Sequence, residues 1–347
     1  MKKLLQRTKM LDEARQGIVK PDAPPEEQAR PKGHNFIVET LIFIAVFFVG
    51  QIAASIVMMP KLIGSYMSDE GYISLTQQYI SGEVGMNDYV KGVTALDVLS
   101  SLPVRLTMLF AMGIITVLVI IFCRFIEKRK ISSMGFRKNG AVKEYLVGMV
   151  IGIVILSAAV GICLLTGALT FDGLMPNISF GAIALFFVAY LVQGMSEEVL
   201  MRGYFMVSLS RRSPIALAVV ISSVAFSLAH ISNSNVTVLA LINIFLFGVF
   251  AGVYILKRGN IWGACAIHSL WNFVQGHIYG IQVSGTTSDQ SVLAMSAVNG
   301  KELISGGLFG LEGGLAVTIV LVVCTVVMLF TKTKQSELSE LPETAAA

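Results

Sequence analysis

Residues capable of acid–base or hydrolytic chemistry occur in three separate apolar stretches of this sequence. They are Glu197, Glu198, Arg202, His230, His268 and Asn272. A charge at membrane depth costs at least about 2.5 kcal/mol, so ionisable residues there usually face the interior of a helix bundle and mark a site. A carboxylate, two histidines and an amide together indicate hydrolysis in a water-filled cavity within the membrane.

Helical spacing separates the acidic group into a pair and a single carboxylate. Glu198 and Arg202 are four residues apart, so they share a helix face and can form an ion pair. Such a pair offsets part of the cost of burying its two charges. The pair has either a purely structural role or a role in supporting a catalytic site. Glu197 has no local partner, and its face carries Tyr190 and Gln193. We therefore predict that Glu197 is a general base.

The other two stretches each place polar groups on one helix face. Phe226 and His230 are four residues apart, and His268, Asn272 and Gln275 follow one another at helical spacing. The second set forms a polar stripe on an otherwise apolar helix. These residues are predicted to meet Glu197 inside the bundle.

Three further polar residues have simpler interpretations. A single buried histidine is more often a hydrogen-bonded core residue than a catalyst, so His277, near a helix end, and His34, in the tail, are not assigned to the site. Asn243 has no polar neighbour one turn away and is predicted to tie two helices together.

The composition indicates a membrane protein. Hydrophobic residues make up 54% of the chain and charged residues 14%, against about 25% charged in a soluble domain. The net charge of +4 does not indicate a nucleic-acid partner, because the basic residues cluster between the apolar runs. Four cysteines lie in apolar segments without the spacing of disulfides or zinc sites.

Eight apolar runs come near the length of about 20 residues that a helix needs to cross a bilayer. They are approximately 36–59, 104–123, 145–170, 180–203, 214–230, 236–256, 260–280 and 313–331. Lysine and arginine gather in alternate connections, which places both termini in the cytoplasm. The long connections 60–103 and 281–312 are predicted to be small structured caps.

We therefore predict an all-α fold, a polytopic membrane helix bundle of about eight transmembrane helices with both termini cytoplasmic. Residues 1–35 are charged and proline-rich and are predicted to be a flexible cytoplasmic tail. The bundle spans 36–331, with its motif-bearing core at about 180–331. Residues 332–347 form a short cytoplasmic tail. The protein is predicted to be integral to the membrane, and to the plasma membrane if the source is bacterial.

Three motifs carry a resemblance to a known family. They are Glu197-Glu198-x-x-x-Arg202, Phe226-x-x-x-His230 and His268-x-x-x-Asn272. In this order on three hydrophobic helices they resemble the CPBP family, the CAAX proteases and bacteriocin-processing enzymes. This family is also called Abi and includes the type II CAAX prenyl endopeptidases. The resemblance runs over roughly residues 180–331, including the glycine-rich stretch before the last helix.

The resemblance implies an intramembrane endopeptidase acting on a membrane-associated peptide or protein. Glu197 would activate water, with His230 helping to hold or polarise it. His268 and Asn272 would donate hydrogen bonds to the oxyanion of the tetrahedral intermediate. Glu198 and Arg202, together with Phe226 of the second motif, would support these groups.

A zinc ion is a second possibility, because the family is often described as metalloproteases. Glu197, His230 and His268 would then be the ligands, with an open fourth position for water. The HExxH spacing is absent, however, and Asn272 is a poor zinc ligand. Metal-free water and zinc-bound water both stay open from the sequence.

Three other functions compete with this interpretation. Gly194-Met195-Ser196 faintly resembles the GxS of rhomboid serine proteases, but a serine nucleophile would leave two glutamates and Asn272 unused. An ion-coupled transporter would also use buried carboxylates and histidines, yet we find no internal repeat. A non-catalytic membrane regulator or bacteriocin immunity protein would bind a peptide without cutting it.

Overall fold

The structure, a computed structural model, describes residues 5–18, 33–96, 98, 101–286 and 290–333. Its helices are α1 (Lys9–Gln16), α3 (Phe36–Met67), α4 (Glu70–Ser81), α5 (Met86–Ala95), α6 (Leu102–Ala111), α7 (Gly113–Ile121), α8 (Ala141–Leu165), α9 (Phe180–Glu198), α10 (Val207–Leu209), α11 (Ile215–Leu228), α12 (Val238–Arg258), α13 (Trp262–Phe273), α14 (Glu302–Ser305) and α15 (Leu315–Phe330). Three π-helical segments continue helices, η2 (Phe122–Ile126), η4 (Val199–Met206) and η5 (Val274–Ile278). The fold is therefore almost entirely helical.

Five helical stretches in the described part of the chain are long and apolar enough to cross a membrane. They are Phe36–Met67, Leu102–Ile126, Ala141–Leu165, Phe180–Leu209 and Val238–Arg258. Of the other three predicted runs, two form the shorter apolar helices α11 and α15, and the third forms α13 with η5. The membrane helix bundle is confirmed, while the number of eight spans stays a prediction.

Helix α3 illustrates how the sequence specifies a membrane helix. It begins at Asn35, whose side-chain oxygen accepts a hydrogen bond from the Val38 N–H at 3.0 Å. Apolar side chains at helical spacing then stay exposed along its outer face, among them Ile37, Leu41, Phe48, Ile52 and Ile56. An exposed apolar stripe of this length fits contact with lipid rather than water.

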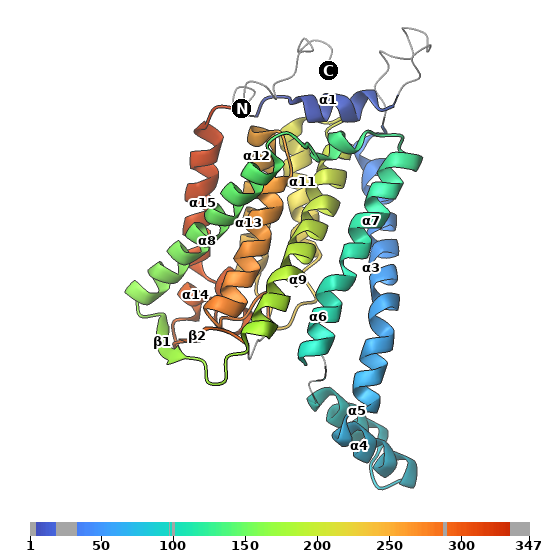
Figure 1. The fold of residues 1–347 in the computed structure, drawn as a ribbon, viewed down its shortest axis with the longest axis vertical. Coiled ribbons are helices and arrows are strands. Elements are labelled where there is room, and N and C mark those ends of the chain that lie inside the picture. Colours follow the sequence, from blue (N-terminus) through green and yellow to red (C-terminus); the bar gives the residue numbers. More distant parts are fainter. Residues whose placement is uncertain (1–4, 19–32, 97, 99–100, 287–289, 334–347) are drawn as a thin grey trace.

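Helix α13 lies between α8 and α9 at the centre of the bundle (Figure 1). Two glycines permit this close packing: a Cβ atom at Gly152 of α8 would collide with the Ile267 carbonyl oxygen, and one at Gly194 of α9 with the backbone of Ser269. Helix α12 packs between α11 and α15, while α6 and α7 cover the other side of α9 and α3 packs against them. The glycines therefore bring α13, with His268, against the acidic end of α9.

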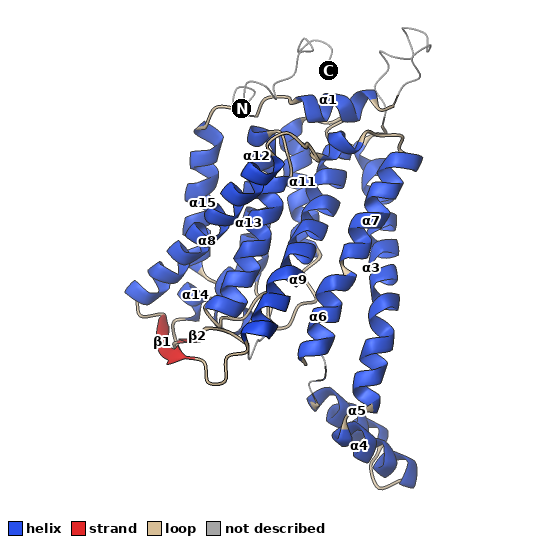
Figure 2. Cartoon of the chain, viewed as in Figure 1, coloured by secondary structure: helices blue, strands red, loops and turns tan. Residues whose placement is uncertain are grey.

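Two short strands depart from the all-α prediction. Strands β1 (Leu169–Leu174) and β2 (Leu293–Ala297) pair antiparallel beyond the end of α8, as Figure 2 shows. Chain that leaves a helix must satisfy its backbone groups elsewhere, and pairing the two connections does so. The predicted cap at 281–312 thus contains β2 and α14, and the cap at 60–103 contains the hairpin of α4 and α5.

The described part of the predicted tail over 1–35 contains a helix. Helix α1 buries Met10, Leu11 and Ala14 and packs against the 3-10 turn η3 (Ile131–Met134). The average composition of the tail concealed this short apolar face. Residues 1–4 and 19–32 of the predicted tail, and 334–347 at the other end, lie outside the described residues. In Figure 1, α1 and the end of α15 lie at the same end of the bundle.

Candidate active site

The acidic motif occupies the junction between α9 and the π-helical segment η4. Glu197 and Glu198 are the last residues of α9, and Arg202 lies within η4. As the spacing predicted, Arg202 Nη1 donates to Glu198 Oε1 at 3.0 Å, and both side chains are fully buried. π-Helical segments within α-helices occur frequently at functional sites.

His268 on α13 bridges the two glutamates. Its Nδ1 lies 2.9 Å from Glu198 Oε1, the atom that also accepts from Arg202. Its Nε2 lies 3.5 Å from Glu197 Oε2. Glu198 therefore does more than neutralise Arg202: it fixes the imidazole ring so that Nε2 faces Glu197, as the carboxylate does in a catalytic triad.

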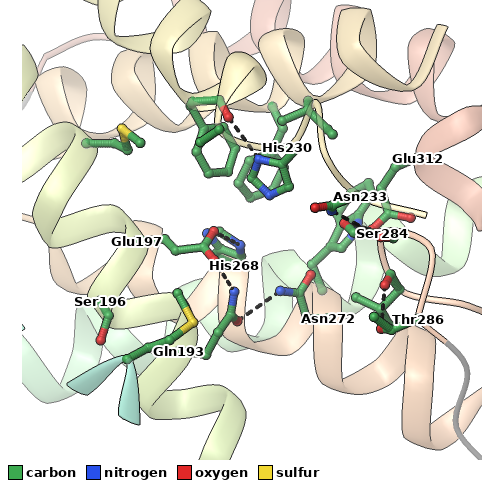
Figure 3. A pocket seen from close by; sticks show the side chains of 18 of the residues that line it. Gln193, Ser196, Glu197, His230, Asn233, His268, Asn272, Ser284, Thr286 and Glu312 are labelled. Carbon is green, nitrogen blue, oxygen red and sulfur yellow. Dashed lines mark hydrogen bonds and ion pairs between the residues drawn. The ribbon is translucent and has the colours of Figure 1, made fainter. Parts of the chain in front are cut away.

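A chain of amides holds Glu197 from the opposite side. Gln193 Nε2 donates to Glu197 Oε1 at 2.6 Å, and Gln193 Oε1 accepts from Asn272 Nδ2 at 3.0 Å (Figure 3). Glu197 Oε2 is buried and has no hydrogen-bond partner in the structure. One oxygen of Glu197 is thus anchored, and the other is left as an acceptor beside His268.

His230 lies just beyond the end of α11, on the side of the cavity facing Glu197 (Figure 3). Its Nδ1 lies 2.8 Å from the Phe226 carbonyl oxygen. Because a carbonyl only accepts, Nδ1 carries the hydrogen, and Nε2 of the neutral ring is left as an acceptor. The ring of Phe226 packs edge-on against His230 and His268, with centroids 4.9 and 5.8 Å away.

Phe226 also stabilises the buried arginine. The guanidinium carbon of Arg202 lies 4.3 Å from the centroid of the Phe226 ring, a cation–π contact. The Nε and Nη2 atoms of Arg202 are buried and have no hydrogen-bond partner in the structure. The face of the Phe226 ring therefore compensates for part of the hydrogen bonding that Arg202 lacks. This contact explains why the second motif contains an aromatic residue.

All four predicted catalytic residues line one cavity of about 430 Å³. Glu197, His230, His268 and Asn272 lie around it in Figure 3. Much of the remaining wall is apolar and includes Phe47, Leu109, Ile115, Ile244 and Leu321. The cavity is large enough for a segment of peptide and places polar groups on a few chosen sides, as ligand sites commonly do.

Sequence reasoning missed part of the polar lining. Gln193 was recognised only as one polar residue on the face of Glu197, although the spacing of four residues could have suggested the contact. Asn233, Ser284 and Glu312 also line the cavity, but they come from connections between helices. No periodic signal predicts where such loop residues point.

The described residues do not assemble a metal site. No group of three histidine, cysteine, aspartate or glutamate side chains within the described ranges could hold a metal ion. The hydrogen bonds of His268 Nδ1 to Glu198 and of His230 Nδ1 to the Phe226 carbonyl do not decide this, because metal-ligating histidines usually make such bonds with their second ring nitrogen. As placed, Glu197, His230 and His268 do not come together as a group that could hold zinc.

The serine of the rhomboid alternative is used elsewhere. Ser196 donates to the Val192 carbonyl at 2.8 Å and accepts from Thr116 Oγ1 at 3.0 Å. In Figure 3 it points away from both histidines. These contacts give Ser196 a packing role between α7 and α9.

The three residues left outside the predicted site have structural contacts. Asn243 Nδ2 donates to the carbonyls of Glu312 and Gly314, and its Oδ1 accepts from Thr318 Oγ1 of α15 at 2.7 Å, so it ties α12 to α15 and to the loop before it. His277 is fully buried, with Nδ1 2.6 Å from the Gln290 carbonyl. His34 lies outside the cavity, 3.7 Å from Glu39.

Comparison with known families identifies the region that carries the motifs. Residues 179–274 match the model of the type II CAAX prenyl endopeptidase Rce1-like family. All three motifs fall within this range, so the predicted resemblance is confirmed. The match ends before the loop that carries Glu312. Searches of curated proteins and of solved structures gave no match.

Proposed function

We propose that this chain, whose residues 179–274 match the model of the type II CAAX prenyl endopeptidase Rce1-like family, is an intramembrane endopeptidase. Its substrate would be a membrane-associated peptide or protein. The family implies a protease, and one observation carries the proposal for this site. Glu197 Oε2 is a buried acceptor without a hydrogen-bond donor, beside His268 in a cavity among apolar helices. A carboxylate oxygen in that setting suits the activation of water.

The reaction begins with a water held between Glu197 Oε2 and His230 Nε2. The carboxylate takes a proton as the water oxygen bonds to the carbonyl carbon of the scissile peptide. Collapse of the tetrahedral intermediate breaks the C–N bond, and the same proton passes from Glu197 to the departing amine. Gln193 keeps Oε1 occupied, so Oε2 is the oxygen that faces the water.

Asn272 and His268 are placed to stabilise the oxyanion. Asn272 Nδ2 has two hydrogens and donates one to Gln193, which leaves the other for the substrate. His268 already donates Nδ1–H to Glu198, so it can donate Nε2–H to an oxyanion only as an imidazolium. The carboxylates of Glu197 and Glu198 balance that positive charge.

Cleavage of membrane-associated peptides by the purified protein tests the proposal. The wild type and the Ser196→Ala variant should both cleave the peptide, because the described hydrogen bonds of Ser196 go to Val192 and Thr116. Glu197→Gln and His230→Ala should lose cleavage. Normal cutting by Glu197→Gln would overturn the mechanism, and a cellular phenotype that survives this substitution would favour a non-catalytic regulator.

Chelation gives a separate test of the water-activating group. Since the ligands do not converge on a metal position, we expect cleavage to persist after dialysis against a chelator. Loss of cleavage that added zinc restores would show that the side chains rearrange around a metal. The variants above keep their expected order in either case.

We also propose eight membrane crossings with both termini in the cytoplasm. Eight apolar helical stretches and the common location of α1 and the end of α15 support this arrangement. Reporter fusions after residues 172, 212 and 258 test it. The first reporter should lie outside the cytoplasm and the other two inside it.

A further inference from the structure

A second buried carboxylate lines the same cavity. Glu312 lies in the short turn η7 (Leu311–Gly313) before α15 and is 7% exposed. In Figure 3 it lies with Asn233 and Ser284 on the side of the cavity away from Glu197. The mechanism above gives this carboxylate no role, and the match to the protease family ends well before it.

The hydrogen-bond partners of Glu312 are neutral. Gln275 Nε2 donates to Oε2 at 2.6 Å, and Ser284 Oγ donates to Oε1 at 3.3 Å. Among the ion pairs of the described residues, none includes Glu312. Glu198, in contrast, faces the guanidinium of Arg202. A buried carboxylate usually has a cationic partner, because neutral donors offset only part of its desolvation.

The position of Glu312 is fixed by the surrounding helices. Its carbonyl oxygen accepts from Asn243 of α12 at 2.7 Å, and Gln275 of η5 holds its side chain. The carboxylate therefore cannot simply turn out to solvent. Burial raises the pKa of Glu312 to about 7, so the carboxyl readily loses its proton near neutral pH when a cation arrives.

We propose that the Glu312 end of the cavity is a subsite for a cationic group of the substrate, the side chain of a lysine or arginine near the scissile bond. The inference rests on the proposed endopeptidase function and specifies its substrate class. Asn233 and Thr286 lie at the same end and offer further polar groups to an ammonium or guanidinium. The apolar walls accommodate the neighbouring side chains, so the expected substrate is a hydrophobic peptide with one basic residue.

Binding tests this without requiring cleavage. Glu197→Gln protein in detergent is titrated with fluorescent hydrophobic peptides in which one lysine is moved along the sequence, each paired with its norleucine analogue. At one position lysine should improve affinity by about tenfold, the value of a charge-assisted hydrogen bond. Adding Glu312→Gln should abolish this difference. Glu302→Gln should keep it, because Glu302 is an exposed glutamate in the same connection.

A second variant guards against a folding defect. Ser284→Ala removes one neutral donor and leaves the charge of Glu312 intact, so the preference for lysine should be kept or increased. Loss of the preference in this variant, or its persistence in Glu312→Gln, would overturn the subsite. The absence of any lysine-preferring position would do the same.

Cleavage by the wild type separates the two proposals. Cutting without a lysine preference would support the endopeptidase and overturn the subsite. Binding with a preference that depends on Glu312, but without cutting, would support the subsite and count against the endopeptidase. Cutting with a Glu312-dependent lysine preference in kcat/KM would support both.

Discussion

Two groups of buried charges in this protein differ in their balance. The first lies where α3, η2 and the chain after α10 meet and consists of Glu39, Glu127, Arg129 and Arg211. We call it the structural cluster. The second, which we call the candidate-site cluster, consists of Glu197, Glu198, Arg202 and His268. Both are held by ion pairs across elements, yet only the second borders the cavity.

The structural cluster pairs every carboxylate with an arginine. Arg211 contacts both Glu39 and Glu127, and Arg129 Nη1 donates to Glu127 at 2.9 Å. In the candidate-site cluster the one arginine contacts Glu198, so Glu197 faces only the imidazole of His268, which is charged only when protonated. This carboxylate without a permanent cationic partner, the surplus carboxylate, is the one beside the cavity. Its environment therefore differs from that of the carboxylates in the structural cluster, which each contact an arginine.

Removing the surplus carboxylate should have the largest effect on activity. Glu197→Gln is expected to lower kcat by about 10³-fold, the loss typical of a general base. Its free energy of unfolding should stay the same or rise, because Glu197 Oε2 has no hydrogen bond to lose. Single-turnover cleavage and denaturant unfolding in detergent measure the two quantities. A large loss of stability would place Glu197 with the structural cluster.

Breaking the structural cluster should lower the free energy of unfolding and leave kcat unchanged. Arg129→Met removes a fully buried guanidinium that binds Glu127, Ser208 and the Gly203 carbonyl, and should cost about 3 kcal/mol of folding free energy. The kcat of the folded protein should not change. Arg124→Met is the matched control, since Arg124 is exposed in the same segment. Equal unfolding curves for the two variants would refute the comparison.

Shortening one carboxylate in each cluster sharpens the comparison further. Glu198→Asp keeps the charge beside Arg202 but withdraws the oxygen that orients His268, so kcat should fall about 10²-fold with little change in KM. The pH dependence of kcat/KM should also shift, which a packing defect alone would not produce. Glu127→Asp, the same change in the structural cluster, should leave both kinetic quantities as in the wild type.

Local spacing accounts for what the sequence predicted well. The pair of Glu198 and Arg202 follows from a separation of four residues, which places two side chains on the same face of an α-helix. The apolar runs predicted the bundle because lipid contact requires long apolar helices. The motif order then placed His230, His268 and Asn272 in one cavity, and the structure brings them together there.

The sequence did not predict the contacts between helices and loops that are distant in the chain. The hydrogen bond of His268 to Glu198 depends on how closely α13 approaches α9, which the contact at Gly194 permits. Glu312 belongs to a loop whose path is set by Asn243, far away in sequence. The apolar face of α1 is too short to stand out from a charged tail. Each of these depends on tertiary packing rather than on periodicity.

The smallest expected effect concerns the amide chain that holds the surplus carboxylate. Gln193→Ala removes the hydrogen bonds to Glu197 Oε1 and from Asn272, so both side chains lose part of their orientation. We expect kcat to fall about tenfold, the value of one hydrogen bond to a charged group. Gln51→Ala on α3 is the control: Gln51 lines the same cavity, but among the described contacts it is Gln193 that bonds to Glu197 and Asn272, so this variant should leave kcat unchanged. Equal kinetics for the two variants would mean that Glu197 is held by its own helix and by His268 alone.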